Sequence, residues 1–128
     1  MLNAKCDPPR PPIQDDVTIY HSTPHGLMDS LRRKIEPEVF VNVEPVMDMK
    51  WDMLACHKSQ KEWLDVSQGM DAYLKVMKDF AAELGERSGK FKYAEGFRRH
   101  SWLGFSAVEL DPLSEVLGKD VIPNPRYK

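Results

Sequence analysis

The most regular hydrophobic pattern in this chain is helical and spans residues 70–86. Apolar and aromatic side chains recur there at three- and four-residue spacing, at Met70, Tyr73, Leu74, Met77, Phe80, Ala81 and Leu84. Charged side chains fill the opposite side of the same helix. A helix with one apolar face packs that face against a core. The pattern therefore predicts a core-packing helix over residues 70–86.

A second helix is predicted over residues 45–64, because Pro45 suits the first turn of a helix and apolar residues again share one face. Polar residues fall within the same arc, namely Lys50, His57, Gln60 and Lys61. Buried polar groups need hydrogen-bond partners. His57 is therefore interpreted either as a core histidine with a satisfied ring or as a group that faces a cleft between helix and sheet.

Residues 16–43 are predicted to form strands joined by a turn. Residues 17–20 are β-branched and aromatic, which favours a strand, and the segment 23–26 contains the Pro and Gly of a turn. Residues 38–43 alternate valines with Phe40 and are apolar at nearly every position. A strand that is apolar on both faces is usually covered on both faces.

A further strand is predicted over residues 91–97, where Gly96 indicates a bulge or the close approach of another segment. Residues 1–15 are Pro-rich and are expected to be extended. Residues 111–128 are expected to form an irregular tail with one short helical turn before Gly118. The chain is interpreted as a single, partial α/β domain that occupies residues 1–128.

The composition of the chain limits which partners and which cellular location are expected. The chain has 128 residues, of which 41% are hydrophobic and 30% charged, with a net charge of −2. This near-neutral balance argues against nucleic acid as a partner. No apolar run reaches the ~20 residues of a membrane span, and the first dozen residues lack the apolar stretch of a signal peptide. The two cysteines exclude a disulfide framework, and a cytoplasmic location is expected.

The residue types that could carry chemistry are mainly four histidines, His21, His25, His57 and His100. No two of them have the i, i+4 spacing of a helical zinc-binding pair, and a zinc site needs three or four converging ligands. The Arg-Arg-His cluster at residues 98–100 is interpreted as a solvated or subunit-facing basic patch, or alternatively as an anion contact. The chain contains no P-loop and no GxGxxG motif.

Two segments resemble motifs of the PIG-L/LmbE family of deacetylases. Residues 50–60, KWDMLACHKSQ, resemble the "K…AL.AH.SQ" helix of that family, and residues 93–97, YAEGF, resemble its "YAE.F" segment. Residues 40–43 look like the strand that leads into the Lys-containing helix. The resemblance covers roughly residues 1–105 and corresponds to the C-terminal half of the family domain.

The resemblance implies a zinc-dependent hydrolase that removes acetyl groups from N-acetylglucosamine-type sugars. It implies the C-terminal part of a Rossmann-like three-layer sandwich, with few strands and two main helices. In the family, zinc is held by a His and an Asp of a His-Pro-x-Asp-Asp segment and by a later His. No residue of this chain matches a zinc ligand or the general base. We therefore expect no catalytic residue here, and we expect an oligomer or a partner half-domain.

The candidate substrate-side residues fall into two groups. His57, Ser59, Gln60 and Glu95 match motif positions of the family, whereas Tyr20, His21 and His25 lie at a predicted strand end and turn. Strand ends in α/β sheets are where binding sites form. Two hypotheses remain open: the chain is part of a deacetylase that is not catalytic alone, or it is a non-enzymatic α/β interaction module or split-enzyme subunit.

Overall fold

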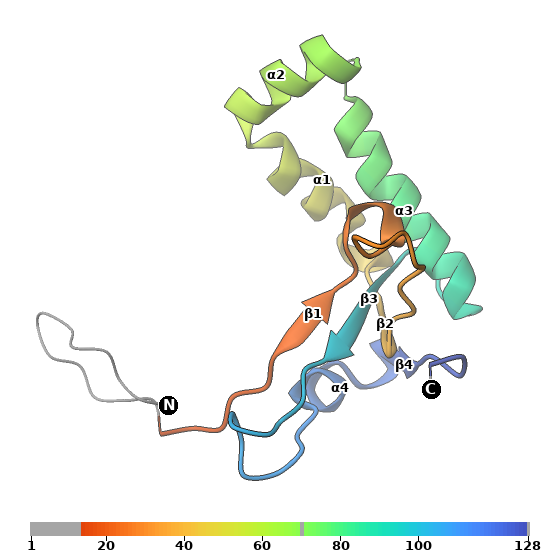
Figure 1. Cartoon of the computed structure of the whole chain (residues 1–128). Helices are drawn as coiled ribbons and strands as arrows, with labels where there is room; N and C mark the ends of the chain where they lie inside the picture. Colours follow the sequence, from red (N-terminus) through yellow and green to blue (C-terminus); the bar gives the residue numbers. More distant parts are fainter. Residues whose placement is uncertain (1–13, 70, 128) are drawn as a thin grey trace, which may run out of the picture.

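The computed structural model describes residues 14–69 and 71–127 and contains one four-stranded sheet with helices on both of its faces (Figure 1). The strands are β1 (Tyr20–Ser22), β2 (Val39–Asn42), β3 (Ala94–Arg99) and β4 (Val121–Pro123). The helices are α1 (Met47–Ala55), α2 (Lys58–Gln68), α3 (Ala72–Ser88) and α4 (Pro112–Leu117). Single 3-10 turns are η1 (His25–Leu27), η2 (Glu44–Val46) and η3 (Gly118–Asp120). Apart from residues 14 and 15, the Pro-rich segment expected over residues 1–15 lies outside the described residues.

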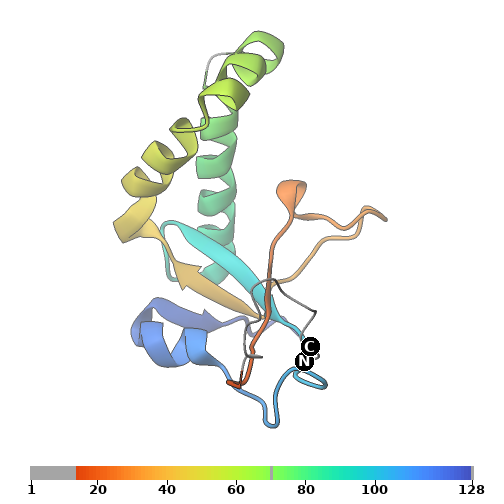
Figure 2. The ribbon, with the colours of Figure 1, turned by 90° about the vertical axis from the view of Figure 1, so that its left-hand side faces the viewer.

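The core lies on both faces of the sheet, and the mixed α/β class is confirmed. On one face the fully buried Phe40 packs with Leu84 of α3 and Ala94 of β3. On the other face Val39 belongs to a smaller cluster that Leu113 of α4 helps to cover. Figure 2 shows α1, α2 and α3 grouped at one end of the molecule and α4 with β4 at the other. Strand β2 is therefore covered on both faces, as its continuous apolar pattern predicts.

The sheet is antiparallel throughout, so the expectation of a Rossmann-like parallel sandwich is wrong. The strand order is β1-β3-β2-β4, and β3 runs antiparallel to both of its neighbours. The β2–β4 pair is antiparallel as well. The apolar pattern of β2 cannot separate the two cases, because a strand covered on both faces has the same pattern in either kind of sheet.

The strand ends differ from those expected. Strand β1 begins at Tyr20, where the strand predicted over residues 17–20 ends. The residues before it still run beside the chain after β3, since the His100 N–H donates to the Ile19 carbonyl at 2.8 Å. Strand β3 begins and ends a few residues later than the predicted strand 91–97.

The prediction of a single helix over residues 45–64 is wrong, because the helical conformation is interrupted between α1 and α2. Backbone angles at His57 are φ −77° and ψ 66°, which are not helical. No Pro or Gly marks this break in the sequence. The polar arc expected on one continuous face is therefore divided between two helices, and His57, Ser59 and Gln60 are all exposed. In the described part of the chain, no helix is both long and apolar enough to cross a membrane.

The tail contains the helical turn expected before Gly118, as α4, but it is otherwise more regular than expected because β4 follows. Asp111 caps α4 by accepting a hydrogen bond from the Ser114 N–H, and Pro112 occupies the first turn. After β4, the buried side chain of Asn124 donates to the Pro37 carbonyl at 2.8 Å. These local and long-range hydrogen bonds hold the tail against the sheet.

Strand β3 comes so close to neighbouring segments that Gly96 has no space for a side chain. A Cβ atom there would lie 2.7 Å from Pro37 Cβ and 3.0 Å from Thr23 Cγ2. Ala94, two residues earlier, is fully buried. The close approach indicated by Gly96 in the sequence is therefore present, and it joins the segments before β2 and after β1 to β3.

The burial of Val39 in the cluster beneath α4 can be tested by truncating its side chain. We expect Val39→Ala to lower the free energy of unfolding by about 2 kcal/mol, because it removes buried methyl groups and leaves a cavity. Val116→Ala is the matched control, since Val116 is 81% exposed on α4 and its truncation should cost less than about 0.5 kcal/mol. Urea unfolding measures both. Equal losses would contradict the described burial of this face.

Candidate functional site

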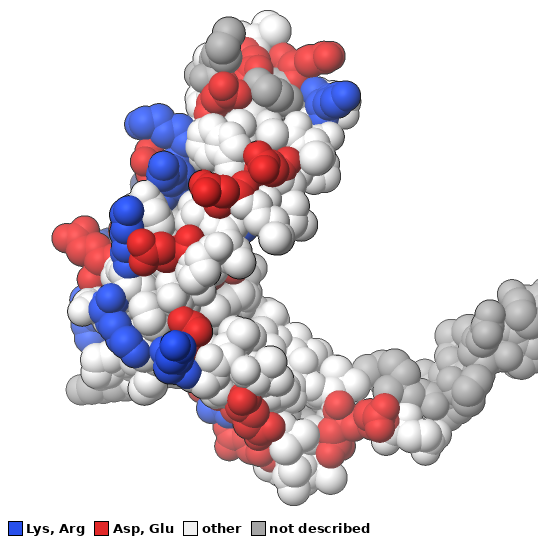
Figure 3. All heavy atoms as spheres, turned by 180° about the vertical axis from the view of Figure 1, so that it is seen from behind, with Lys and Arg blue, Asp and Glu red and all other residues white. Residues whose placement is uncertain are grey.

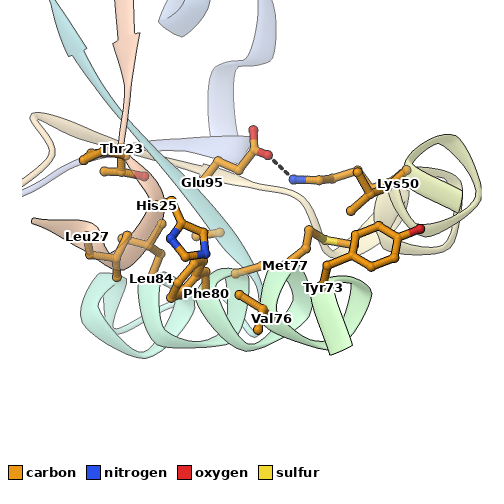
Figure 4. A pocket seen from close by; sticks show the side chains of 14 residues that line it. Thr23, His25, Leu27, Lys50, Tyr73, Val76, Met77, Phe80, Leu84 and Glu95 are labelled. Atoms are coloured by element: carbon orange, nitrogen blue, oxygen red, sulfur yellow. Dashed lines mark hydrogen bonds and ion pairs between the residues drawn. The ribbon is translucent and has the colours of Figure 1, made fainter. Parts of the chain in front are cut away.

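An apolar hollow lies between η1, α1, α3 and β3, and we call it the cleft (Figure 4). Its volume is about 400 Å³. Its apolar part comes from the inward side of α3, including Met77, Phe80 and Leu84. Its polar part includes Lys50 and Glu95. An apolar concave surface with a few polar groups is the usual form of a small-molecule site.

Lys50 of α1 and Glu95 of β3 form an ion pair in the wall of the cleft. The Lys50 Nζ donates to Glu95 Oε1, and Figure 4 shows the two side chains reaching toward each other. The side chains are 26% and 38% exposed, so the pair is partly shielded from water and open to a ligand. The pair also gives Lys50 the partner that its place in an otherwise apolar arc requires.

His25 lies at the edge of the cleft because the η1 turn is anchored beside it. Its ring meets the Phe80 ring edge-on, with centroids 5.1 Å apart. Leu27 is only 5% exposed and holds the turn in the core. The φ angle of Leu27 is +53°, a left-handed conformation that costs a non-glycine residue roughly 1–2 kcal/mol. Burial of Leu27 compensates for this strain and fixes where His25 lies.

Tyr73 of α3 adds an unusual polar group to the cleft lining. Its hydroxyl is buried, and it has no hydrogen-bond partner among the described residues. Buried hydroxyls are normally paired. The apolar pattern of residues 70–86 assigns Tyr73 to the core and gives no signal of this unpaired group.

The other sequence-predicted candidates lie apart from the cleft or at its margin. His57 lines a neighbouring hollow of about 290 Å³ that shares Lys50, Leu54 and Met77 with the cleft. Ser59 and Gln60 are exposed on α2. The structure therefore brings His25 and Glu95 together at one site and leaves His57 beside it.

Tyr20 and His21 have structural partners of their own. The Tyr20 hydroxyl donates to Asp111 Oδ1 at 2.6 Å and accepts from the Leu113 N–H at 3.2 Å. Burial, and then the hydrogen bond to Asp111, raise the pKa of Tyr20 to about 12. The His21 ring is hydrogen-bonded to His100, with 2.9 Å between Nε2 and Nδ1. Neither residue contributes to the cleft.

The zinc that the resemblance implies needs three or four converging ligands. Among residues 14–69 and 71–127, no group of three or more His, Cys, Asp or Glu side chains converges to hold a metal ion. His25 contacts an aromatic ring and His57 is exposed at a helix break.

Basic and acidic side chains are interspersed over the face seen from behind in Figure 3, so this face carries no large area of a single sign.

Comparison of the chain with protein-family models, with curated proteins and with solved structures found no match.

The hydrogen bonding and burial of the Tyr20 hydroxyl can be tested by titration. Its pKa is raised from 10.0 to about 12 in the folded chain, so its stabilising effect is complete below pH 10 and is lost as the pH rises toward 12. We expect the free energy of unfolding to fall more steeply over this interval in the native chain than in Tyr20→Phe. Tyrosinate absorbance should show one late-titrating group that the variant lacks. Identical pH dependence of the two proteins would contradict the assignment.

Proposed function

We propose that this chain is the C-terminal part of a zinc-dependent deacetylase of the PIG-L/LmbE type. Such an enzyme hydrolyses the amide of N-acetylated sugars. In this proposal the chain supplies a substrate-binding wall, and the metal centre is supplied by residues other than those described. The chain alone is then not catalytic.

The ion pair between Lys50 and Glu95 is the observation that supports this proposal most directly. Lys50 belongs to the segment 50–60 and Glu95 to the segment 93–97, the two segments on which the resemblance rests. They lie far apart in the sequence, and their side chains meet in the wall of one cleft. A shared site is what the proposal requires of two segments that serve one substrate.

The cleft has groups suited to an N-acetylated sugar. The Lys50 ammonium can donate to a hydroxyl or carbonyl oxygen, and the Glu95 carboxylate can accept from a hydroxyl or an amide N–H. Met77 and Phe80 offer an apolar surface for an acetyl methyl group or for the C–H face of a sugar ring. His25 lies across the cleft edge, where it can contact a polar substituent.

A second candidate function, a non-enzymatic interaction module, is favoured by exposed apolar side chains on the first two helices. Trp63 is 64% and Val66 is 90% exposed on α2, and Met49 and Met53 are more than half exposed on α1. Exposed apolar groups of this size are typical of surfaces that meet a partner. A deacetylase half that docks on its metal-binding half would need such a surface as well.

The test is a titration of the isotope-labelled full chain with N-acetylglucosamine, followed through its backbone amide NMR signals. We expect saturable shifts near His25, Lys50 and Glu95, and weaker shifts with glucose, which lacks the acetamido group. Lys50→Met should weaken binding at least fivefold, because it removes a donor and leaves Glu95 unpaired. Lys75→Met is the control, since the exposed Lys75 pairs with Asp79 within α3 and does not line the cleft.

Two results would contradict the proposal. Equal shifts with both sugars, or shifts that avoid the cleft, would remove the substrate role and leave the interaction module as the better account. Release of acetate from N-acetylglucosamine by the zinc-treated chain alone would instead contradict the claim that the metal centre lies elsewhere.

A further inference from the structure

Another hollow lies beside the β1–β3 pair and is lined largely by arginine, histidine and hydroxyl-bearing residues. Its volume is about 280 Å³. Donor groups in its lining come from His21, Arg98, His100, Ser101 and Tyr127, among others. None of these five residues lines the cleft. The proposed deacetylase function gives this hollow no role.

Strand register places three of these side chains on one face. His21 of β1 is the direct cross-strand partner of Arg98 in β3. His100 lies two residues after Arg98 and therefore projects to the same side as Arg98. The two imidazoles are hydrogen-bonded between His21 Nε2 and His100 Nδ1, 2.9 Å apart. Neutral imidazoles carry one N–H each and this bond uses one of them, so the pair keeps one outer N–H that can donate to a ligand.

The Arg98 side chain is fixed in place by a hydrogen bond from its Nε and by the Tyr127 ring. Its Nε donates to the Glu36 carbonyl at 2.6 Å, and its guanidinium lies 5.4 Å from the centre of the Tyr127 ring. Among the described residues, the two terminal nitrogens of Arg98 make no hydrogen bond or ion pair. A guanidinium held in this way loses little entropy when it binds an anion.

The nearby carboxylates are occupied by other arginines. Arg99 pairs with Glu38 through two of its nitrogens, at 2.9 and 2.6 Å. The Glu36 carboxylate pairs with Arg87 at 2.8 Å. The positive charge of Arg98 is therefore not neutralised by either of these acids, and the hollow favours an anionic ligand.

We propose that this hollow binds the phosphate group of a small phosphorylated ligand. The two terminal nitrogens of Arg98 can donate to two phosphate oxygens, and the outer N–H of the histidine pair and the Ser101 hydroxyl can donate to a third. Several donors around one arginine suit a tetrahedral dianion better than a planar carboxylate, which a single fork satisfies. The volume of about 280 Å³ accommodates a phosphate carried on one small molecule.

The test is a titration of the labelled full chain with inorganic phosphate at constant ionic strength. We expect saturable shifts of the backbone amides of residues 21–23 and 98–101. Glucose 6-phosphate should shift the same amides, and acetate should bind at least tenfold more weakly. Equal affinity for acetate and phosphate would overturn the assignment of the ligand class.

Variants distinguish specific binding of phosphate in this hollow from non-specific attraction of anions to the protein surface. Arg98→Gln should weaken phosphate binding at least tenfold, whereas Arg33→Gln, at an exposed arginine outside the hollow, should leave it unchanged. The double variant His21→Ala with His100→Ala is the second test, because both side chains are exposed and their loss spares the core. Unchanged phosphate affinity in a folded Arg98→Gln or double-histidine variant would overturn the proposal, and so would an equal loss in Arg33→Gln.

Discussion

The close packing around strand β3 is the constraint on which the rest of this structure depends. At Gly96 an added Cβ would lie 2.7 Å from Pro37 Cβ, a separation that folded proteins do not tolerate. Strand β3 is hydrogen-bonded to β1 on one side and to β2 on the other, and it packs on α3. Because Thr23 also packs against Gly96, the η1 turn that follows Thr23 lies at the edge of the cleft. The position of His25 thus depends on the lack of a side chain at Gly96 in β3.

The cleft adds an electrostatic connection to this packing. Lys50 leaves α1 on a side that is otherwise apolar, and the Glu95 carboxylate of β3 gives it a partner. The pair is partly shielded, so each group is costly to leave unpaired, yet both remain within reach of a ligand. The same two residues thus hold α1 toward the sheet and supply polar groups to the proposed site.

Local patterns predicted the individual elements better than their arrangement. The regular spacing of apolar residues predicted α3, and the continuous apolar run predicted β2. The antiparallel order could not be predicted, because burial on both faces leaves the same pattern in parallel and antiparallel strands. The break at His57 has no Pro or Gly to signal it. At the site, His25 and Glu95 were among the candidates, but the pairing of His21 with His100 depends on a strand register set by residues far apart in the sequence.

The central claim is that the segments around Lys50 and Glu95 meet in the folded chain, and a double-mutant cycle tests it most directly. The free energy of unfolding would be measured for Lys50→Met, Glu95→Gln and their combination. The exposed pair Lys75–Asp79 within α3 would serve as the reference. The account predicts a coupling of about 1 kcal/mol between Lys50 and Glu95, against about 0.3–0.5 kcal/mol for the reference pair. A coupling between Lys50 and Glu95 indistinguishable from zero would contradict the account.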